Sequence, residues 1–171
     1  MDLDKLYKLQ AELDRTILEN EKKRTGKEMN KNTLLEQTIL ALLVEVGELA
    51  NTTRCFKHWS KKGTMGKEII LDELADVWHF YLSLGNQMVI RTDKPLVLTG
   101  YTLTQLFIKT YEKASRLTEI ESSSLFIRNT YKSLGVLIYS LGKELGFTDT
   151  EVEQAYLKKH KENYKRQEEG Y

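Results

Sequence analysis

LLVEVGELA at residues 42–50 and IILDELADVWHF at residues 69–80 are the most apolar stretches of this sequence, and each carries two acidic residues three positions apart. The pairs are Glu45 with Glu48 and Glu73 with Asp76. On a helix, residues three apart share a face, so each pair directs two carboxylates the same way. Two such helices packed together are expected to bring four carboxylates into one buried pocket.

The rest of the sequence favours an all-α fold. Pro95 is the only proline, and apolar residues recur mainly at three- and four-residue intervals, as in a bundle of about six helices. Thr148 and Glu151 match a capping box at the start of the last helix. We expect helices over residues 2–24, from 32 or 33 to near 58, from 67 onward, 102–119, 124–145 and from 148 onward.

Composition limits the class of protein. The 171 residues, 40% of them hydrophobic, fit one domain spanning residues 1–171. With 26 basic and 25 acidic residues, the net charge of +1 gives no reason to expect nucleic acid or a membrane as partner. The lone Cys55 cannot form an internal disulfide, and the N-terminus does not read as a signal segment. We expect a cytoplasmic protein.

The four carboxylates predict a metal site. Burying one ionised carboxylate costs several kcal/mol, so a buried cluster needs cations or protons. A set of oxygen ligands without histidine or cysteine selects Mg²⁺, with Mn²⁺ as a substitute, over zinc. The alternative is an ordinary solvated helix face, where such acidic pairs are common, but the apolar flanks of both pairs argue against it.

A second candidate site lies near the C-terminus. Lys159, Asn163 and Arg166 stand at i, i+4 and i+7 and share one helix face. The two cations and the amide are suited to binding phosphate oxygens. The alternative is a solvated basic face, because Lys158, Lys161 and Lys165 lie nearby.

These residues resemble a known family. The acidic signature is that of the all-α nucleoside triphosphate pyrophosphatases, the MazG-like superfamily, and the finer match is to the dimeric dUTPases. It covers almost the whole chain and is carried by four segments: QAELD at residues 10–14, KHW at 57–59, ELADVWHF at 73–80 and the pattern from Lys159 to Tyr171.

The resemblance implies hydrolysis of dUTP, and of dUDP, to dUMP by a homodimeric dUTP diphosphatase. Such an enzyme keeps uracil out of DNA and supplies dUMP for thymidylate synthesis. The resemblance assigns two or more Mg²⁺ ions to Glu45, Glu48, Glu73 and Asp76. Glu48 is our choice for the general base, with Glu45 as the alternative; the sequence does not decide between them or say which phosphorus is attacked.

The resemblance also assigns substrate contacts. Uracil is assigned to Gln10, Asp14 and Trp59, and the deoxyribose to His79 and Phe80. Each has a plainer alternative: an exposed helix residue for Gln10, a loop anchor for Trp59, a structural histidine for His79 and core for Phe80. The remaining contacts implied by the matching segments are Lys57, Lys159, Asn163, Arg166 and Tyr171.

Two other functions stay open at this point. One is a pyrophosphatase of the same fold with another preferred nucleotide, such as dCTP. The other is a helical partner-binding protein without Mg²⁺-dependent turnover. A regulatory protein partner is compatible with all three hypotheses, and the sequence contains no feature that tests it.

Overall fold

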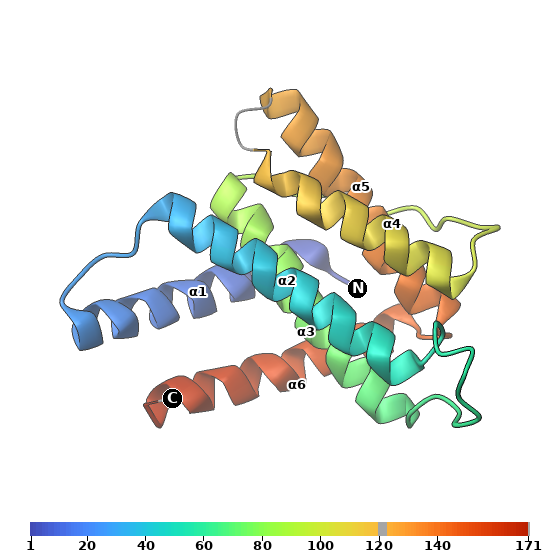
Figure 1. Ribbon diagram of the computed structural model, residues 1–171. Helices are drawn as coiled ribbons and strands as arrows, with labels where there is room; N and C mark the ends of the chain where they lie inside the picture. Colours follow the sequence, from blue (N-terminus) through green and yellow to red (C-terminus); the bar gives the residue numbers. More distant parts are fainter. Residues whose placement is uncertain (120–122, 171) are drawn as a thin grey trace.

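A computed structural model of the chain describes residues 1–119 and 123–170. Over these residues it is all-helical, with six α-helices, one short 3₁₀ helix and no strand, which confirms the predicted fold class. Figure 1 shows the arrangement. The helices are α1 (Leu3–Thr25), α2 (Lys31–Thr53), α3 (Lys67–Met88), α4 (Leu103–Ser115), η1 (Arg116–Thr118), α5 (Ser124–Glu144) and α6 (Asp149–Glu168).

Local signals set most helix ends. Asn30 caps α2 by accepting hydrogen bonds from two backbone N–H groups, and the capping box of Thr148 and Glu151 at the start of α6 is confirmed. The predicted end of α2 near residue 58 was wrong. Arg54 takes a left-handed conformation with φ 58°, so α2 stops at Thr53 and residues 54–66 form a loop.

The predicted helix over residues 102–119 is interrupted near its end. The α-helix stops at Ser115, and the chain continues as a single 3₁₀ turn, η1. Tightening of the last helical turn to 3₁₀ geometry is common, and sequence periodicity does not reveal it.

Helix α3 lies at the centre of the molecule and packs against α1, α2, α5 and α6 (Figure 1). Its apolar residues are covered on nearly all sides, although Ile69 near its start is 48% exposed. The largest are fully buried, among them Trp78, Tyr81, Leu74 and Leu82. α2 and α3 form a hairpin joined by the loop 54–66, which places the two acidic stretches side by side.

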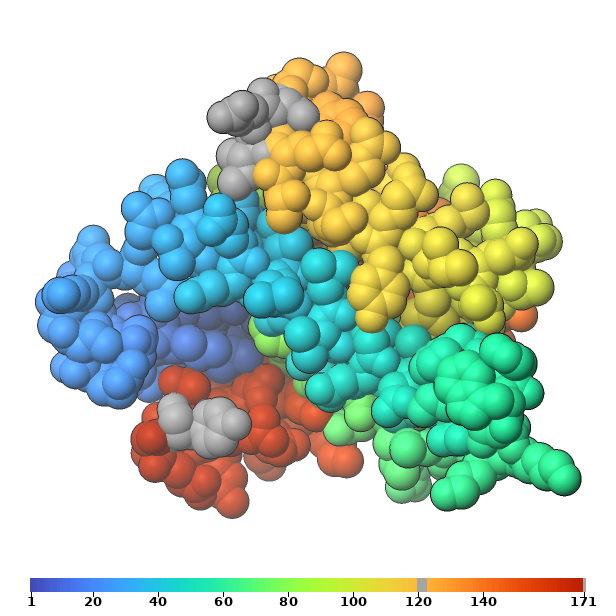
Figure 2. Space-filling model, viewed as in Figure 1, coloured from blue at the N-terminus to red at the C-terminus, as the bar shows by residue number. Residues whose placement is uncertain are grey.

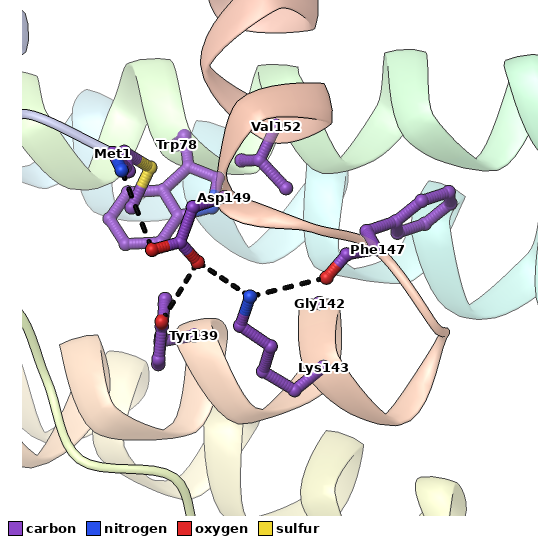
Figure 3. A pocket seen from close by; sticks show the side chains of 8 residues that line it. All are labelled: Met1, Trp78, Tyr139, Gly142, Lys143, Phe147, Asp149 and Val152. Carbon is purple, nitrogen blue, oxygen red and sulfur yellow. Dashed lines mark hydrogen bonds and ion pairs between the residues drawn. The ribbon is translucent and has the colours of Figure 1, made fainter.

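The start of α6 is fastened by an ionic cluster around Asp149 (Figure 3). Its carboxylate accepts hydrogen bonds from Lys143 at 2.5 Å and from the Tyr139 hydroxyl at 2.8 Å. The N-terminal ammonium of Met1 lies 3.4 Å away, and Lys94 lies 2.5 Å away. The cluster therefore connects the N-terminus, the loop before α4, α5 and α6. No helix among the described residues combines the length and apolar character needed to cross a bilayer.

Candidate metal centre and nucleotide site

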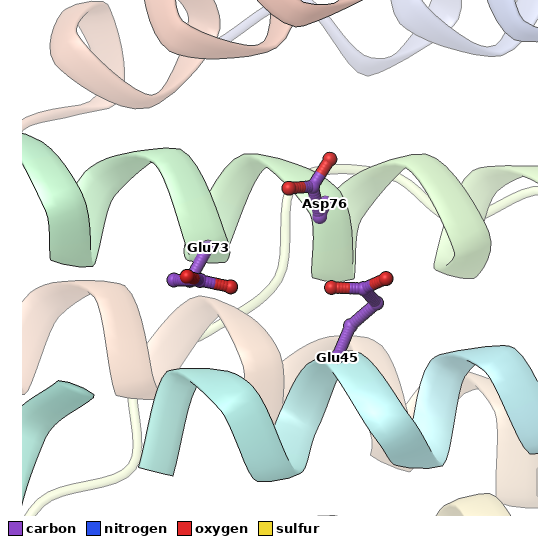
Figure 4. Close-up of side chains that lie close together, drawn as sticks. All are labelled: Glu45, Glu73 and Asp76. Carbon is purple, nitrogen blue, oxygen red and sulfur yellow. The ribbon is translucent and has the colours of Figure 1, made fainter. Parts of the chain in front are cut away.

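Three acidic side chains from α2 and α3 face one another in a half-buried cluster (Figure 4). Glu45 comes from α2, and Glu73 and Asp76 come from successive turns of α3. One carboxylate oxygen of each lies within 4.8 Å of the others. The hairpin therefore brings together members of both acidic pairs.

Glu48 lies at the edge of this cluster. It is one turn beyond Glu45 on α2, and its side chain is exposed, whereas the three clustered residues are half-buried. Its charge still contributes to raising the pKa of Glu45 and of Glu73. The pocket of four buried carboxylates expected from the spacing is thus three half-buried carboxylates with an exposed fourth beside them.

The cluster has an excess of negative charge. Burial, followed by repulsion from Asp76, Glu48 and Glu73, raises the pKa of Glu45 to about 7. The pKa values of Glu73 and Asp76 are also raised, in each case chiefly by burial. A site that resists ionisation of its own carboxylates is suited to binding a cation.

Lys159 on α6 supplies the nearest positive charge. This lysine is buried, and its Nζ lies 2.8 Å from Asp72 and 2.7 Å from Asp76. Burial alone would lower its pKa, but the bonds to both carboxylates outweigh this and raise it. The lysine predicted to bind phosphate therefore neutralises the acidic cluster in this structure. Sequence reasoning missed Asp72, although it directly precedes Glu73.

The other two residues of the predicted phosphate clamp also lie on α6. Arg166 donates to Glu162 at 2.6 Å, and its charge offsets a small part of the rise in the pKa of Asp76, so it acts on the acidic cluster. Asn163 is half-buried one turn before it. Of the three predicted residues, Lys159 bonds directly to α3, through Asp72 and Asp76.

Gln10 and His79 belong to one buried network with Tyr156. The Tyr156 hydroxyl donates to Gln10 Oε1 at 2.8 Å, and the His79 ring stacks on the Tyr156 ring with centroids 4.0 Å apart. Nδ1 of His79 lies 2.7 Å from the same Gln10 oxygen. Burial lowers the pKa of His79 to about 3, so the imidazole is neutral at physiological pH.

Asp14, one turn after Gln10 on α1, extends this network. Gln10 Nε2 donates to Asp14 Oδ1 at 2.7 Å, and burial raises the pKa of the Asp14 carboxyl. Gln10 is 4% exposed, so the alternative of an ordinary exposed helix residue was wrong. Tyr156 was not foreseen as a site residue, although it lies three positions before Lys159 in the sequence.

The other predicted contacts lie outside this network. Phe80 is half-buried and packs against the core. Trp59 is 67% exposed and contacts Phe56 and His58 within its own loop, which lies away from α1 in Figure 1. Lys57 in the same loop is hydrogen-bonded to Asn51. Tyr171 lies outside the described residues.

The surface is hollowed between α2 and α6, with α3 at the floor of the furrow (Figure 2). The acidic cluster and Lys159 lie on the helices that form this furrow, and the Gln10 network joins α1 to α3 and α6. The arrangement offers oxygen ligands for a hard cation beside basic and amide groups, which is a combination suited to a metal–phosphate ligand.

Comparison with known proteins agrees with this chemistry. A family model described as dUTPase matches residues 2–171. Among curated proteins, none matches the chain.

Proposed function

Because the chain belongs to the dUTPase family and is a dUTP diphosphatase, we propose that it hydrolyses dUTP, and dUDP as well, to dUMP with Mg²⁺ at the acidic cluster between α2 and α3. The observation that carries the proposal is the convergence of Glu45, Glu73 and Asp76 from two helices. In the cell this reaction would keep uracil out of DNA and supply dUMP for thymidylate synthesis.

The residues present fit Mg²⁺. Glu45, Glu73 and Asp76 would hold it, with Glu48 as a further ligand from the edge of the cluster, and Mn²⁺ is compatible with the same oxygen set. Two or more ions are proposed per site. When bound, Mg²⁺ would neutralise phosphate charge and lower the pKa of a water molecule bound to it.

Glu48 is our proposed general base. A base that receives a proton from water must be within reach of that water. Glu48 is exposed at the edge of the cluster, whereas Glu45 is half-buried among the other carboxylates. This contrast supports Glu48 over the alternative, Glu45.

The basic face of α6 is proposed to bind the phosphates. Lys159 would exchange its bonds to Asp72 and Asp76 for phosphate oxygens once other cations neutralise the carboxylates. Arg166 offers a forked set of donors and Asn163 an amide at the same face. Lys57 and Tyr171 belong to the segments that resemble dimeric dUTPases, and we propose them as further substrate contacts.

The neutral His79 is proposed to hold the nucleoside side of the site in place. Its contacts with Gln10 and Tyr156 fix the orientation of the imidazole ring. Phe80, the next residue on α3, is proposed to lie against the deoxyribose. Gln10 and Asp14 are proposed to face the base, and Trp59 is proposed as a further substrate contact from its loop. The Phe80 ring against C2′ of the sugar would exclude ribose sterically, because ribose carries a hydroxyl on that carbon.

We also propose a homodimer. Large apolar side chains are exposed on the outer faces of α2 and α4: Leu40 is 62%, Val44 48% and Ile108 63% exposed. The two faces are adjacent, because the Tyr111 hydroxyl of α4 lies directly over Gly47 of α2. Exposed apolar patches of this kind mark protein interfaces. Light scattering on the wild type and on Leu40→Glu tests this, and a monomeric wild type would contradict it.

The function is tested by measuring phosphate and pyrophosphate release from dUTP, dUDP, dCTP, dTTP and UTP, with Mg²⁺ and with chelator. We expect Mg²⁺-dependent turnover of dUTP and dUDP, lost in Glu48→Gln and retained in Glu36→Gln, an exposed position on the same helix. Preferred turnover of dCTP would move the chain to a sister activity. Turnover that survives chelator would refute the metal site.

A further inference from the structure

A cavity of about 770 Å³ lies between α1, the start of α2 and the end of α3. Its lining includes Asp14, Leu18, Leu35, Gln87 and Met88. The volume is that of a small-molecule pocket. Because Asp14 both lines the cavity and bonds to Gln10, the cavity adjoins the network that contains His79.

One buried oxygen atom of this lining, Gln87 Oε1, lacks a hydrogen-bond partner among the described residues. The carboxylate of Asp14, which lines the same cavity, is hydrogen-bonded to Gln10 and Ser83. A buried acceptor without a donor costs about 1–3 kcal/mol. The unpartnered oxygen of Gln87 therefore indicates a ligand that brings an N–H or O–H donor.

The orientation of the Gln87 amide is fixed by its neighbours. Its Nε2 donates to Thr38 Oγ1 at 2.9 Å and to Ser83 Oγ at 3.2 Å. Thr38 uses its own hydroxyl proton on the carbonyl of Leu34 at 2.7 Å, so toward Gln87 it can only accept. A flipped amide would place two acceptor oxygens against each other. Gln87 Oε1 is therefore held as a buried acceptor without a partner, in a residue that lines the cavity.

The position of the Gln87 amide along α3 also suits a nucleotide whose phosphates lie at the acidic cluster. By bonding to Ser83, the Gln87 side chain reaches back one turn toward the acidic cluster. Ser83 follows Asp76 by seven residues, which corresponds to about 10 Å along the helix axis. A nucleotide with its phosphates at Asp76 would extend its base toward the amide.

We propose that Gln87 determines base specificity, with its Oε1 accepting the N3–H of uracil. This rests on the proposed function, because it places the phosphates at the acidic cluster. Uracil carries a proton on N3, whereas cytosine carries a lone pair there. The fixed acceptor thus bonds to uracil and repels cytosine. Thymine has the same N3–H, so Gln87 does not discriminate against it.

Two variants test whether Gln87 determines base specificity, and the readouts are nucleotide binding as well as metal-dependent turnover. Gln87→Met keeps the side-chain length but removes the acceptor. Thr38→Val removes the oxygen that fixes the amide, so Gln87 is free to turn its N–H₂ toward the cavity and accept cytosine. The control is Gln37→Met, at an exposed position beside Thr38. The measurements are kcat/KM for dUTP and dCTP, and Kd for dUMP and dCMP by calorimetry.

We expect the dUTP-to-dCTP ratio of kcat/KM, and the dUMP-to-dCMP preference in binding, to fall at least tenfold in Gln87→Met. Thr38→Val should lower both through a gain for cytosine, and the control should keep both. If both ratios are unchanged in both variants while the wild type turns over dUTP, the proposed role of Gln87 is overturned and the proposed function stands. A wild type that prefers dUMP in binding but has no Mg²⁺-dependent turnover would instead refute the proposed function.

Discussion

Lys159 Nζ lies 2.7 Å from Asp76 Oδ2, so a cation of the chain itself sits against one of the residues proposed to hold Mg²⁺. The same ammonium group bonds to Asp72. Breaking a buried ion pair by removing one partner leaves an uncompensated charge, which is costly unless another cation takes its place. The lysine and the metal are therefore expected to compete for the same carboxylate.

The first prediction concerns this competition. Lys159→Met should bind Mn²⁺ about tenfold more tightly in calorimetry, a difference of about 1.4 kcal/mol, because the competing ammonium group is removed. Turnover of dUTP should fall at the same time, because a phosphate contact is lost. Lys158→Met, at the exposed neighbouring position, is the control and should bind Mn²⁺ as the wild type does. Unchanged Mn²⁺ affinity in Lys159→Met would rule out the competition.

The second prediction is a pH dependence of stability without metal. The pKa of Glu45 is about 7 in the folded chain and near 4.5 in an ordinary environment. The folded state thus holds the proton more tightly than the unfolded state, so the free energy of unfolding falls as pH rises from about 4.5 to 7. Denaturant titrations in chelator at pH 5 and pH 8 should show this loss.

Glu45→Gln should reduce this loss, because the amide does not ionise, and Glu36→Gln should leave it in place. Added Mg²⁺ should restore stability at pH 8 in the wild type. An equal pH dependence in the wild type and Glu45→Gln would show that Glu45 is not the group responsible.

The third prediction concerns the packing of α3 on α5. The rings of Tyr81 and Tyr131 are parallel with centroids 4.5 Å apart, and each hydroxyl lies over a glycine of the other helix, Gly135 and Gly85 respectively. A Cβ at Gly135 would lie 2.2 Å from the Tyr81 hydroxyl oxygen. Gly135→Ala should therefore destabilise the fold by about 1–3 kcal/mol through overpacking.

Denaturant unfolding measures this cost, with Gly63→Ala as a control because nothing lies within 4 Å of the Cβ added there. Adding Tyr81→Phe to Gly135→Ala should recover part of the loss, since the closest atom is removed. Strictly additive effects in the double variant would disprove the contact.

The sequence was sufficient to predict the helices and the pairing of the acidic stretches. Periodicity reports which face of a helix is buried, and that information placed Glu45, Glu73 and Asp76 correctly on facing helices. It does not report what a side chain bonds to. The ion pairs of Lys159 and the orientation of Gln87 depend on α6 and α2 approaching α3, and these contacts join residues far apart in sequence.

The same limit explains two expectations that the structure overturned, the exposed alternative for Gln10 and the end of α2 near residue 58. Gln10 has the spacing of an ordinary helix residue, yet α6 covers it and gives it Tyr156 as a partner. The end of α2 at Thr53 depends on the left-handed backbone of Arg54, a residue type with no preference for that conformation. Neither feature has a signal in a single sequence.

The last prediction concerns the ionic cluster at Asp149. Burial alone would raise the pKa of this carboxyl, but hydrogen bonds from Lys143, Lys94 and Tyr139 outweigh it and hold the pKa below its ordinary value of 3.8. The cluster therefore stabilises the fold at any pH above about 4 and loses this contribution only as the solution is made more acidic. Asp149→Asn should lower the free energy of unfolding at pH 7 by about 1–3 kcal/mol, the scale of hydrogen bonds to a charged group. The loss should shrink below pH 4, where the wild-type carboxylate is itself being protonated. Asp93→Asn, at an exposed position one residue from Lys94, is the matched control, and a loss of equal size there would show that the cluster at the start of α6 is not the cause.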